Sequence, residues 1–292
     1  MSSILTNNSA MSALSTLRNI NSNLSNTQDR ISSGLKVQSG KDNAAYFSIS
    51  ETMKGDSGMT KAVNEGLTLT KNVISTGRLG AETVSDLAKQ FVERVAFAQG
   101  EGVDRAEVQK ELVALADRMD ATISQSNFNG SSMFSATAGD KITAVTGITR
   151  DGAGAFQAPT TMDFGKVDLQ AVATALRGID VSAAEDFGVD GVRGGGDDVD
   201  TMQTRLTAAE AELGKAIDAA TTLGVSEKTI ETQQSFLTAL SDKLDSGIGS
   251  MVDADMEEEA ARLQSLQVQQ QLSTQALSIA NQAPQNILSL FR

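Results

Sequence analysis

Residues 10–35 read AMSALSTLRNINSNLSNTQDRISSGL and carry the pattern that decides the fold. Apolar residues recur there at a spacing of seven and form one column, Ala10, Leu17, Leu24 and Ile31. Two further leucines, Leu14 and Leu35, each lie four residues after a member of this column. This repeat is typical of a helix that buries a narrow stripe against another helix. The other positions hold mostly Asn, Ser, Thr and Gln, which are poor helix formers. We therefore expect a helix over about residues 1–36 that needs a partner to be stable.

The opposite end of the chain carries the same kind of stripe, at Met256, Leu263, Leu266, Leu277 and Ala280. Pro284 is expected to bend or end this last helix. The acidic run at 253–259 is interpreted as a helix start, in which an aspartate caps and glutamates lie at the positive end of the dipole; a metal site is the less favoured alternative. Because both ends carry matching stripes, we expect them to pair in one assembly seam.

Further heptad columns predict long helices between the two ends. One helix is expected over about 57–99 and a second from a cap at Asp104 to about 126. Helical repeats resume near 200 and continue to a break at 247–249. The columns are Leu67, Ile74, Ala81, Ala88 and Val95 in the first of these helices, Val108, Leu112, Leu115, Met119 and Ile123 in the second, and Ala209, Ala216, Leu223, Ile230, Leu237 and Leu244 in the last.

The segment at about 130–200 changes character. Asn129-Gly130 is a hairpin-turn signal, residues 141–149 resemble a short strand, and a helix is plausible at 168–177. The acidic residues at 197–200 are interpreted as another helix start, since a calcium loop would need a terminal Glu. The sequence thus predicts a mainly α fold: a long antiparallel helical bundle or coiled coil from both chain ends, with a small mixed α/β inserted outer domain.

Composition excludes several function classes. The 292 residues include no Cys and no His, which removes disulfides, thiolate chemistry, Ser-His-Asp triads and His-based metal sites. We expect no enzyme activity and no cofactor. The net charge of −13 disfavours nucleic acid as a partner. No apolar run approaches 18 residues, so we expect no membrane insertion. The start, MSSILTNN, lacks the features of a Sec-type signal peptide.

Self-assembly is favoured over an ordinary intramolecular bundle. A pair of narrow-striped helices buries one seam and leaves other apolar residues that need neighbouring copies. Head-to-tail contacts between copies give open helical polymers when the rotation does not close. The residues expected to remain outside the seam are Ile4, Leu5, Met11, Ile20, Val268, Ile279 and Leu288.

Two signatures, one at each end, make the chain resemble the bacterial flagellins, and especially those with a short variable domain. At the N-terminal end they are ILTNN at 4–8, ISSGLKV at 31–37 and DNAA at 42–45. At the C-terminal end they are ADM at 254–256 and ANQAPQNIL at 280–288, with a terminal Arg292. The resemblance covers about 1–135 and 200–292.

This resemblance implies a structural subunit that polymerises into the extracellular flagellar filament used for swimming. It divides the chain into an inner-tube helical domain from 1–42 and 250–292, a helical shell domain from 43–136 and 201–249, and a variable outer insertion at 137–200. It also implies export through the flagellar type III apparatus without a cleaved signal peptide. The implied partners are other copies, a cytoplasmic chaperone at the C-terminal helix, and the hook-junction and cap proteins.

Two further expectations follow from the family. Phe91, Arg94 and Ala98 lie in a segment similar to one that an innate immune receptor reads in some flagellins, and departures at Phe91 and Ala98 predict weak recognition. The alternative function is a hook–filament junction protein of the same organelle, which has similar ends. An enzymatic flagellin would need a His-Glu-x-x-His helix, which a chain without His cannot supply.

Overall fold

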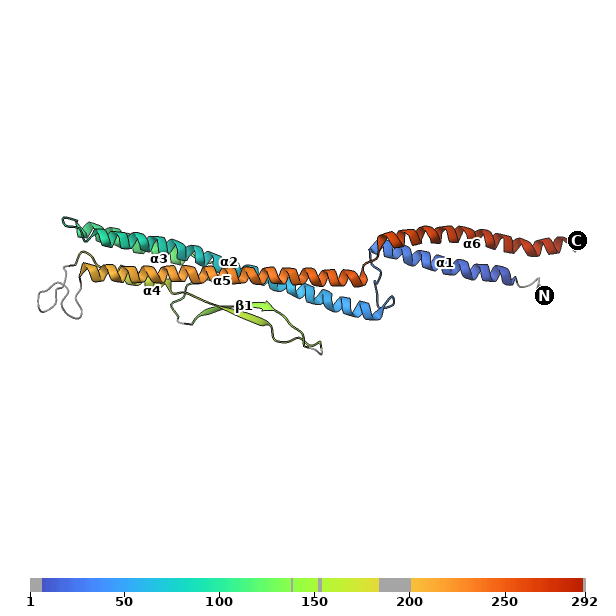
Figure 1. Cartoon of the computed structure of the whole chain (residues 1–292), viewed down its shortest axis with the longest axis horizontal. Helices are drawn as coiled ribbons and strands as arrows, with labels where there is room; N and C mark the ends of the chain where they lie inside the picture. Colours follow the sequence, from blue (N-terminus) through green and yellow to red (C-terminus); the bar gives the residue numbers. More distant parts are fainter. Residues whose placement is uncertain (1–6, 138, 152–153, 184–200, 291–292) are drawn as a thin grey trace. The chain divides into compact units, whose positions relative to one another are not determined.

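The computed structural model describes residues 7–137, 139–151, 154–183 and 201–290, with the side chains of its last helix described as far as 282. It is mainly helical, as predicted, with a small two-stranded sheet (Figure 1). The elements in chain order are α1 (Asn8–Ser33), α2 (Ala44–Phe97), α3 (Arg105–Gln125), β1 (Lys141–Gly147), β2 (Thr160–Gly165), α4 (Leu169–Arg177), α5 (Met202–Val252) and α6 (Met256–Leu290).

The chain forms two compact units. Unit 1 consists of Met1–Ser57 with Asp242–Arg292, and unit 2 is Gly58–Ser241. Helices α2 and α5 each contribute residues to both. These bounds fall inside the two helices, and the predicted divisions at 42/43 and 249/250 stay a prediction. Unit 1 has a small core of its own, where Val37 packs with Ile248 and Val252 near the end of α5.

Unit 1 pairs the two terminal helices. α1 and α6 lie side by side and run antiparallel (Figure 1). Asn7 caps α1 by accepting a hydrogen bond from Ala10 N at 3.1 Å, and Gly34 ends it at φ +73, a left-handed conformation that suits glycine. Beyond Gly34 the two connecting segments are held together by backbone hydrogen bonds, from Ala254 N to Gly34 O at 2.9 Å and from Lys36 N to Val252 O at 2.7 Å.

Unit 2 has one continuous core. The predicted heptad columns of α2, α3 and α5 are confirmed, because their residues are buried. This holds for the column residues from Leu67 to Val95, from Val108 to Ile123 and from Ala209 to Leu237. The same core includes Ala144 and Phe164 of the sheet and the apolar face of α4, with Leu169, Val172, Ala173 and Leu176. The part of the predicted insertion that the structure describes therefore packs into the helical core.

The predicted turn and small elements are present. Asn129 and Gly130 have φ of 51 and 79, as in a type I′ turn. β1 pairs antiparallel with β2, and α4 begins after its cap Asp168. Arg177 ties α4 to α3 through Asp117, at 2.7 Å, and Asp120.

Three helix boundaries differ from prediction. α2 begins at Ala44 instead of 57, because Asn43 Oδ1 accepts hydrogen bonds from Ala45 N and Tyr46 N, both at 3.1 Å. α5 continues through 247–249 to Val252, because burial of Ile248 and Val252 outweighs the cost of about 1 kcal/mol for each helical glycine. α6 runs past Pro284 to Leu290. The predicted helix start at 197–200 lies outside the described residues.

Candidate assembly surface on the terminal helices

The α1 side of the seam is only partly the predicted one. Ala10, Leu17, Leu24 and Ile31 are half-buried. The second column of the heptad seam consists of the residues three positions after these, not four. Of this column, Ala13 is half-buried, and Ile20 and Thr27 are buried. Leu14 is 37 % exposed in this helix pair, and its place in the assembly seam stays a prediction. A heptad seam uses alternating steps of three and four, and the four-step position turns outward here.

Two other predicted seam residues lie away from the contact between the helices. Leu35 follows the end of α1 and packs instead against the small core of Val37, Ile248 and Val252. Met256, which we predicted inside the seam, is 47 % exposed. It is the first residue of α6, and α1 ends nearby at Ser33. Met256 therefore lies outside the contact between α1 and α6.

The α6 side of the seam follows the heptad. Leu266 is buried, and Leu263, Leu277 and Ala280 are half-buried, as predicted. Between them the same face carries polar residues that the sequence analysis did not assign to the seam: Glu259, Gln270 and Ser273. Gln270 Nε2 donates to Asn21 Oδ1 of α1 at 2.7 Å. A criterion based on apolar residues alone passes over these polar positions. Each of them nevertheless lies seven residues before a predicted seam residue: Glu259 before Leu266, Gln270 before Leu277 and Ser273 before Ala280.

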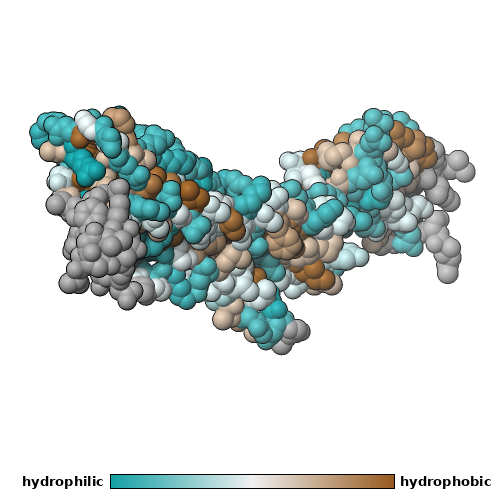
Figure 2. All heavy atoms as spheres, turned by 60° about the vertical axis from the view of Figure 1, so that its left-hand side comes forward, coloured by the Kyte–Doolittle hydropathy of each residue, from teal (hydrophilic) through white to brown (hydrophobic). Residues whose placement is uncertain are grey.

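A second set of apolar residues faces away from the seam. The exposed fractions are 63 % for Met11, 54 % for Val268, 59 % for Leu272 and 68 % for Ile279. With Leu14 they form what we call the outer apolar stripe. On α6 the spacing of four and seven residues places its members on one face, roughly opposite Leu266. Figure 2 shows apolar residues among hydrophilic ones on the surface of the molecule.

The expected exposed residues are thus confirmed in part. Met11, Val268 and Ile279 are exposed as expected, whereas Ile20 is 9 % exposed and belongs to the seam. Ile4 and Leu5, and the side chain of Leu288, lie outside the described part of the chain. Leu272 was missed.

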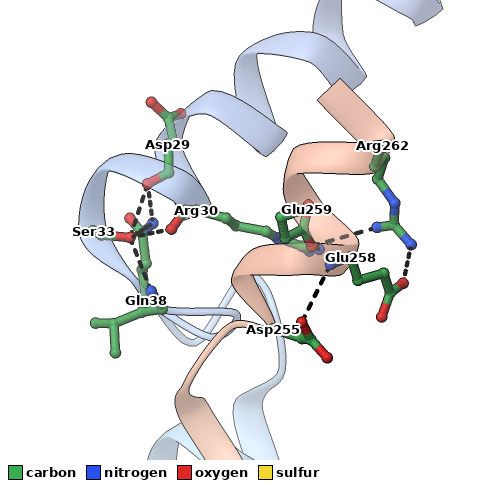
Figure 3. Close-up of polar contacts among 9 residues, drawn as sticks. Asp29, Arg30, Ser33, Gln38, Asp255, Glu258, Glu259 and Arg262 are labelled. Carbon is green, nitrogen blue, oxygen red and sulfur yellow. Dashed lines mark hydrogen bonds and ion pairs between the residues drawn. The ribbon is translucent and has the colours of Figure 1, made fainter. Parts of the chain in front are cut away.

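The charged groups of the helix pair gather at one end. Residues 263–291 contain no Asp, Glu, Lys or Arg, and residues 1–28 contain only Arg18. Figure 3 shows the charged end: Glu259 Oε1 lies 3.1 Å from Arg30 Nη1 and 3.6 Å from Arg262 Nη1, while Arg262 Nη2 contacts Glu258 Oε1 at 2.9 Å. Asp255 accepts hydrogen bonds from the backbone N–H groups of Glu257 and Glu258. The acidic run is therefore a helix start.

The receptor-like positions lie in unit 2 and do not form one surface. Phe91 and Ala98 are buried in the core, with no exposed area. The Arg94 side chain is 51 % exposed, and its Nε lies 3.2 Å from Glu111 Oε2. Weak receptor recognition stays a prediction.

Two features are absent from the described residues. Across these ranges, no three His, Cys, Asp or Glu side chains gather in a way that could hold a metal ion. No helix in the described part of the chain combines the length and apolar character needed to cross a membrane.

Comparison with known proteins agrees with the architecture of the two ends. The bacterial flagellin N-terminal helical region matches residues 4–138, and the bacterial flagellin C-terminal helical region matches 197–291. A flagellin of Brucella melitensis biotype 1 is 34 % identical over 293 residues, covering all of both chains. Flagellin A of Rhizobium meliloti strain 1021 is 33 % identical over 396 residues, again covering both chains fully.

Other relatives point the same way. Flagellin FljM of Caulobacter vibrioides is 31 % identical over 295 residues, covering 100 % of this chain and 99 % of its own. The match to the crystal structure of Bacillus cereus flagellin covers 68 % of this chain and 94 % of that one, at 19 % identity and a TM-score of 0.34. Nothing among these relatives favours a hook–filament junction protein. The chain belongs to the bacterial flagellin family, and it is a structural subunit of the extracellular flagellar filament.

Proposed function

We propose that the subunit joins the filament through its two terminal helices, and that neighbouring copies cover the outer apolar stripe. The observation that carries this proposal is the exposure of Met11, Val268, Leu272 and Ile279 on helices that are nearly free of charge. Burying apolar surface is favourable by about 25 cal/mol per Å². Contacts between identical copies would repeat any like-charge repulsion throughout a polymer, so uncharged faces suit such contacts.

The weakness of the seam supports the same proposal. Most seam residues of α1 are half-buried, and Thr27, Gln270 and Ser273 interrupt the apolar columns. A helix with many Asn, Ser and Gln residues gains most of its stability from packing. We infer that the terminal helices become fully ordered on polymerisation, when further copies supply the packing that one α1–α6 pair lacks.

We also propose the partners that the family resemblance implies. The subunit would leave the cell unfolded through the flagellar type III export apparatus, with α6 held beforehand by a cytoplasmic chaperone. In the organelle it would meet the hook-junction and cap proteins. Marginal terminal helices support this route, because a chain that is easily kept unfolded can be threaded. The mass of subunits from sheared filaments tests it: loss of an N-terminal segment would contradict export without cleavage.

Seeded assembly of purified protein, followed by negative-stain microscopy, tests the assembly surface. The wild-type chain is expected to give long tubes of uniform width. A variant with Val268→Asp, Leu272→Asp and Ile279→Asp is expected to stay soluble, because each change would bury a charge in an apolar contact. Leu272→Met is the matched control and should assemble normally. Normal tubes from the triple variant would refute the proposal.

Truncation gives an independent test. Removal of 1–30 or of 260–292 is expected to leave a soluble, folded monomer that does not polymerise, since the core of unit 2 contains none of these residues. Far-UV circular dichroism would show retained helix. Continued filament growth would count against a role for the terminal helices.

A further inference from the structure

The seam between α1 and α6 holds little information about register. Its columns repeat every seven residues, with Leu17 and Leu24 on α1 and Leu263 and Leu277 on α6. A slip by seven residues would bring the uncharged Gln270 into the place of Leu263 or Leu277, so among these residues it would leave no charge without a partner. In a filament each helix also has the corresponding helices of other copies nearby. Apolar contacts alone would select neither one register nor one partner.

Glu259 is a buried charge in this seam. It lies seven residues before Leu266 and so occupies the same column, where its side chain is 7 % exposed. Oε1 faces Arg30 Nη1 at 3.1 Å, as Figure 3 shows. Oε2 is buried without a hydrogen-bond partner among the described residues. Arg30 is therefore the main compensation for a buried carboxylate.

We propose that Glu259 is the residue that specifies register and partner in the terminal helix pair: it allows α6 to pair with α1 only where Arg30 faces it. In a register slipped by one heptad toward the N-terminal end of α1, Glu259 would lie in the seam opposite Asn23, without Arg30. A buried charge that loses its partner is strongly destabilising. A single polar residue in an apolar heptad column is a known way to fix register at some cost in stability.

The backbone hydrogen bonds of the connecting segments agree with this register. Ala254 N to Gly34 O and Lys36 N to Val252 O lie next to the ion pair in the same unit. They join segments of one chain, whereas α1 of another copy lacks this connection. Arg262, at 3.6 Å from Glu259, belongs to α6 itself and accompanies Glu259 into any register, so of these two arginines Arg30 is the one that distinguishes the registers.

This inference rests on the proposed role of the terminal helices, and cysteine cross-linking in filaments of the full chain tests it. The chain has no Cys, so introduced pairs are its only thiols. Asn21→Cys with Gln270→Cys reports the observed register, since these side chains touch at 2.7 Å. Gln28→Cys with Met256→Cys reports the slip of one heptad that would place Glu259 opposite Asn23, and both of these positions are exposed. Gel mobility separates links within a chain from links between copies.

In the parent filaments the observed-register link is expected to dominate within single chains. Glu259→Leu should lower the ratio of observed to slipped or interchain links by at least about tenfold, because the penalty for slipping is lost. Glu257→Leu, an identical change at an exposed position two residues away, should leave the ratio unchanged. The exchange Arg30→Glu with Glu259→Arg should restore it.

An unchanged ratio in Glu259→Leu filaments would overturn the inference while leaving the filament function intact. If Glu259→Leu gives no filaments, the exchange variant decides: regained filaments with the observed link support the inference, and continued failure overturns it. If the parent chain forms no filaments, the proposed assembly surface is what fails.

Discussion

Gly80 of α2 packs directly against Ser126, the residue after α3: a Cβ atom on Gly80 would lie 2.7 Å from Ser126 Cβ. Ser126 Oγ donates to Thr122 O at 2.6 Å, so the hydroxyl is not free to turn away. We expect Gly80→Ala to destabilise unit 2 by about 1–3 kcal/mol through overpacking. Thermal unfolding should show a lower midpoint.

Gly66 in the same helix provides the control, because a Cβ atom there would meet nothing within 4 Å. Gly66→Ala is expected to stabilise by about 0.5–1 kcal/mol, since alanine loses less backbone entropy on folding. The two variants should therefore shift the midpoint in opposite directions. Equal shifts would show that the close approach at Gly80 is unimportant.

Removal of the two partners of the Arg30–Glu259 pair should have unequal effects. Arg30→Met leaves a buried carboxylate, a change that typically costs about 3–5 kcal/mol. Glu259→Leu leaves an arginine that is already 30 % exposed and can be hydrated. We expect filaments of Arg30→Met to dissociate at clearly lower urea concentration than those of Glu259→Leu. The double variant should resemble Glu259→Leu, and equal sensitivity of the two single variants would contradict the argument.

Acid should destabilise unit 2. Lys71, 3.0 Å from Glu231, holds the pKa of that carboxyl below its ordinary 4.5, and Lys166 lowers the pKa of Asp140 below 3.8. A lowered folded-state pKa gives stability that is present above the unfolded value and lost as pH falls through the folded one. We expect a constant thermal midpoint from about pH 7 to about pH 5 and a decline below about pH 4.5.

Lys71→Met is the matched test of this acid effect. Without the lysine, the pKa of Glu231 should lie closer to its ordinary value, so its share of the acid decline should shrink. The variant and the wild-type chain should then differ less in midpoint at low pH than at neutral pH. A constant difference across the whole range would exclude this linkage.

The cap of α3 should contribute measurably to stability. Asp104 Oδ1 accepts hydrogen bonds from Ala106 N at 3.0 Å and Glu107 N at 3.3 Å. Asp104→Ala is expected to cost about 1 kcal/mol in denaturant unfolding, and Asp104→Asn much less, because asparagine caps nearly as well. An Asn variant as unstable as the Ala variant would point to the lost charge instead of the cap.

Activation of the innate immune receptor by the monomer should be weak in a cell reporter assay. Phe91 and Ala98 are buried and unavailable for contact, which leaves Arg94 as the exposed member of the three positions. Strong activation by monomer would contradict the expectation. A flagellin that the receptor recognises is the positive control.

The core of unit 2 could be predicted from the sequence because its columns contain almost nothing but apolar residues. Leu67, Ile74 and Ala81 on α2, and Leu223 and Ile230 on α5, leave no alternative face. The strand β2 is harder to predict, because its alternation rests on two apolar residues, Met162 and Phe164 on either side of Asp163.

The terminal seam could be predicted only in outline for a related reason. Thr27 and Gln270 occupy seam positions although they are polar, so a criterion of apolar character passes over them. Leu14 and Leu272 are apolar but exposed. The burial of Glu259 cannot be predicted from its neighbours in the sequence, which present it as a glutamate in the first turn of a helix. Its burial depends on Arg30, which lies 229 residues away in the chain.

The uncharged stretch from 263 to 291 has one more consequence. Dissolved ions act on proteins mainly by screening charges, and acidity acts by titrating them. This stretch offers neither target, so neither screening nor titration of its own side chains alters its packing as a swimming cell moves between waters of different salt content. Charge screening in the paired ends must then act through Arg18 and the charged residues near Arg30 and Glu259.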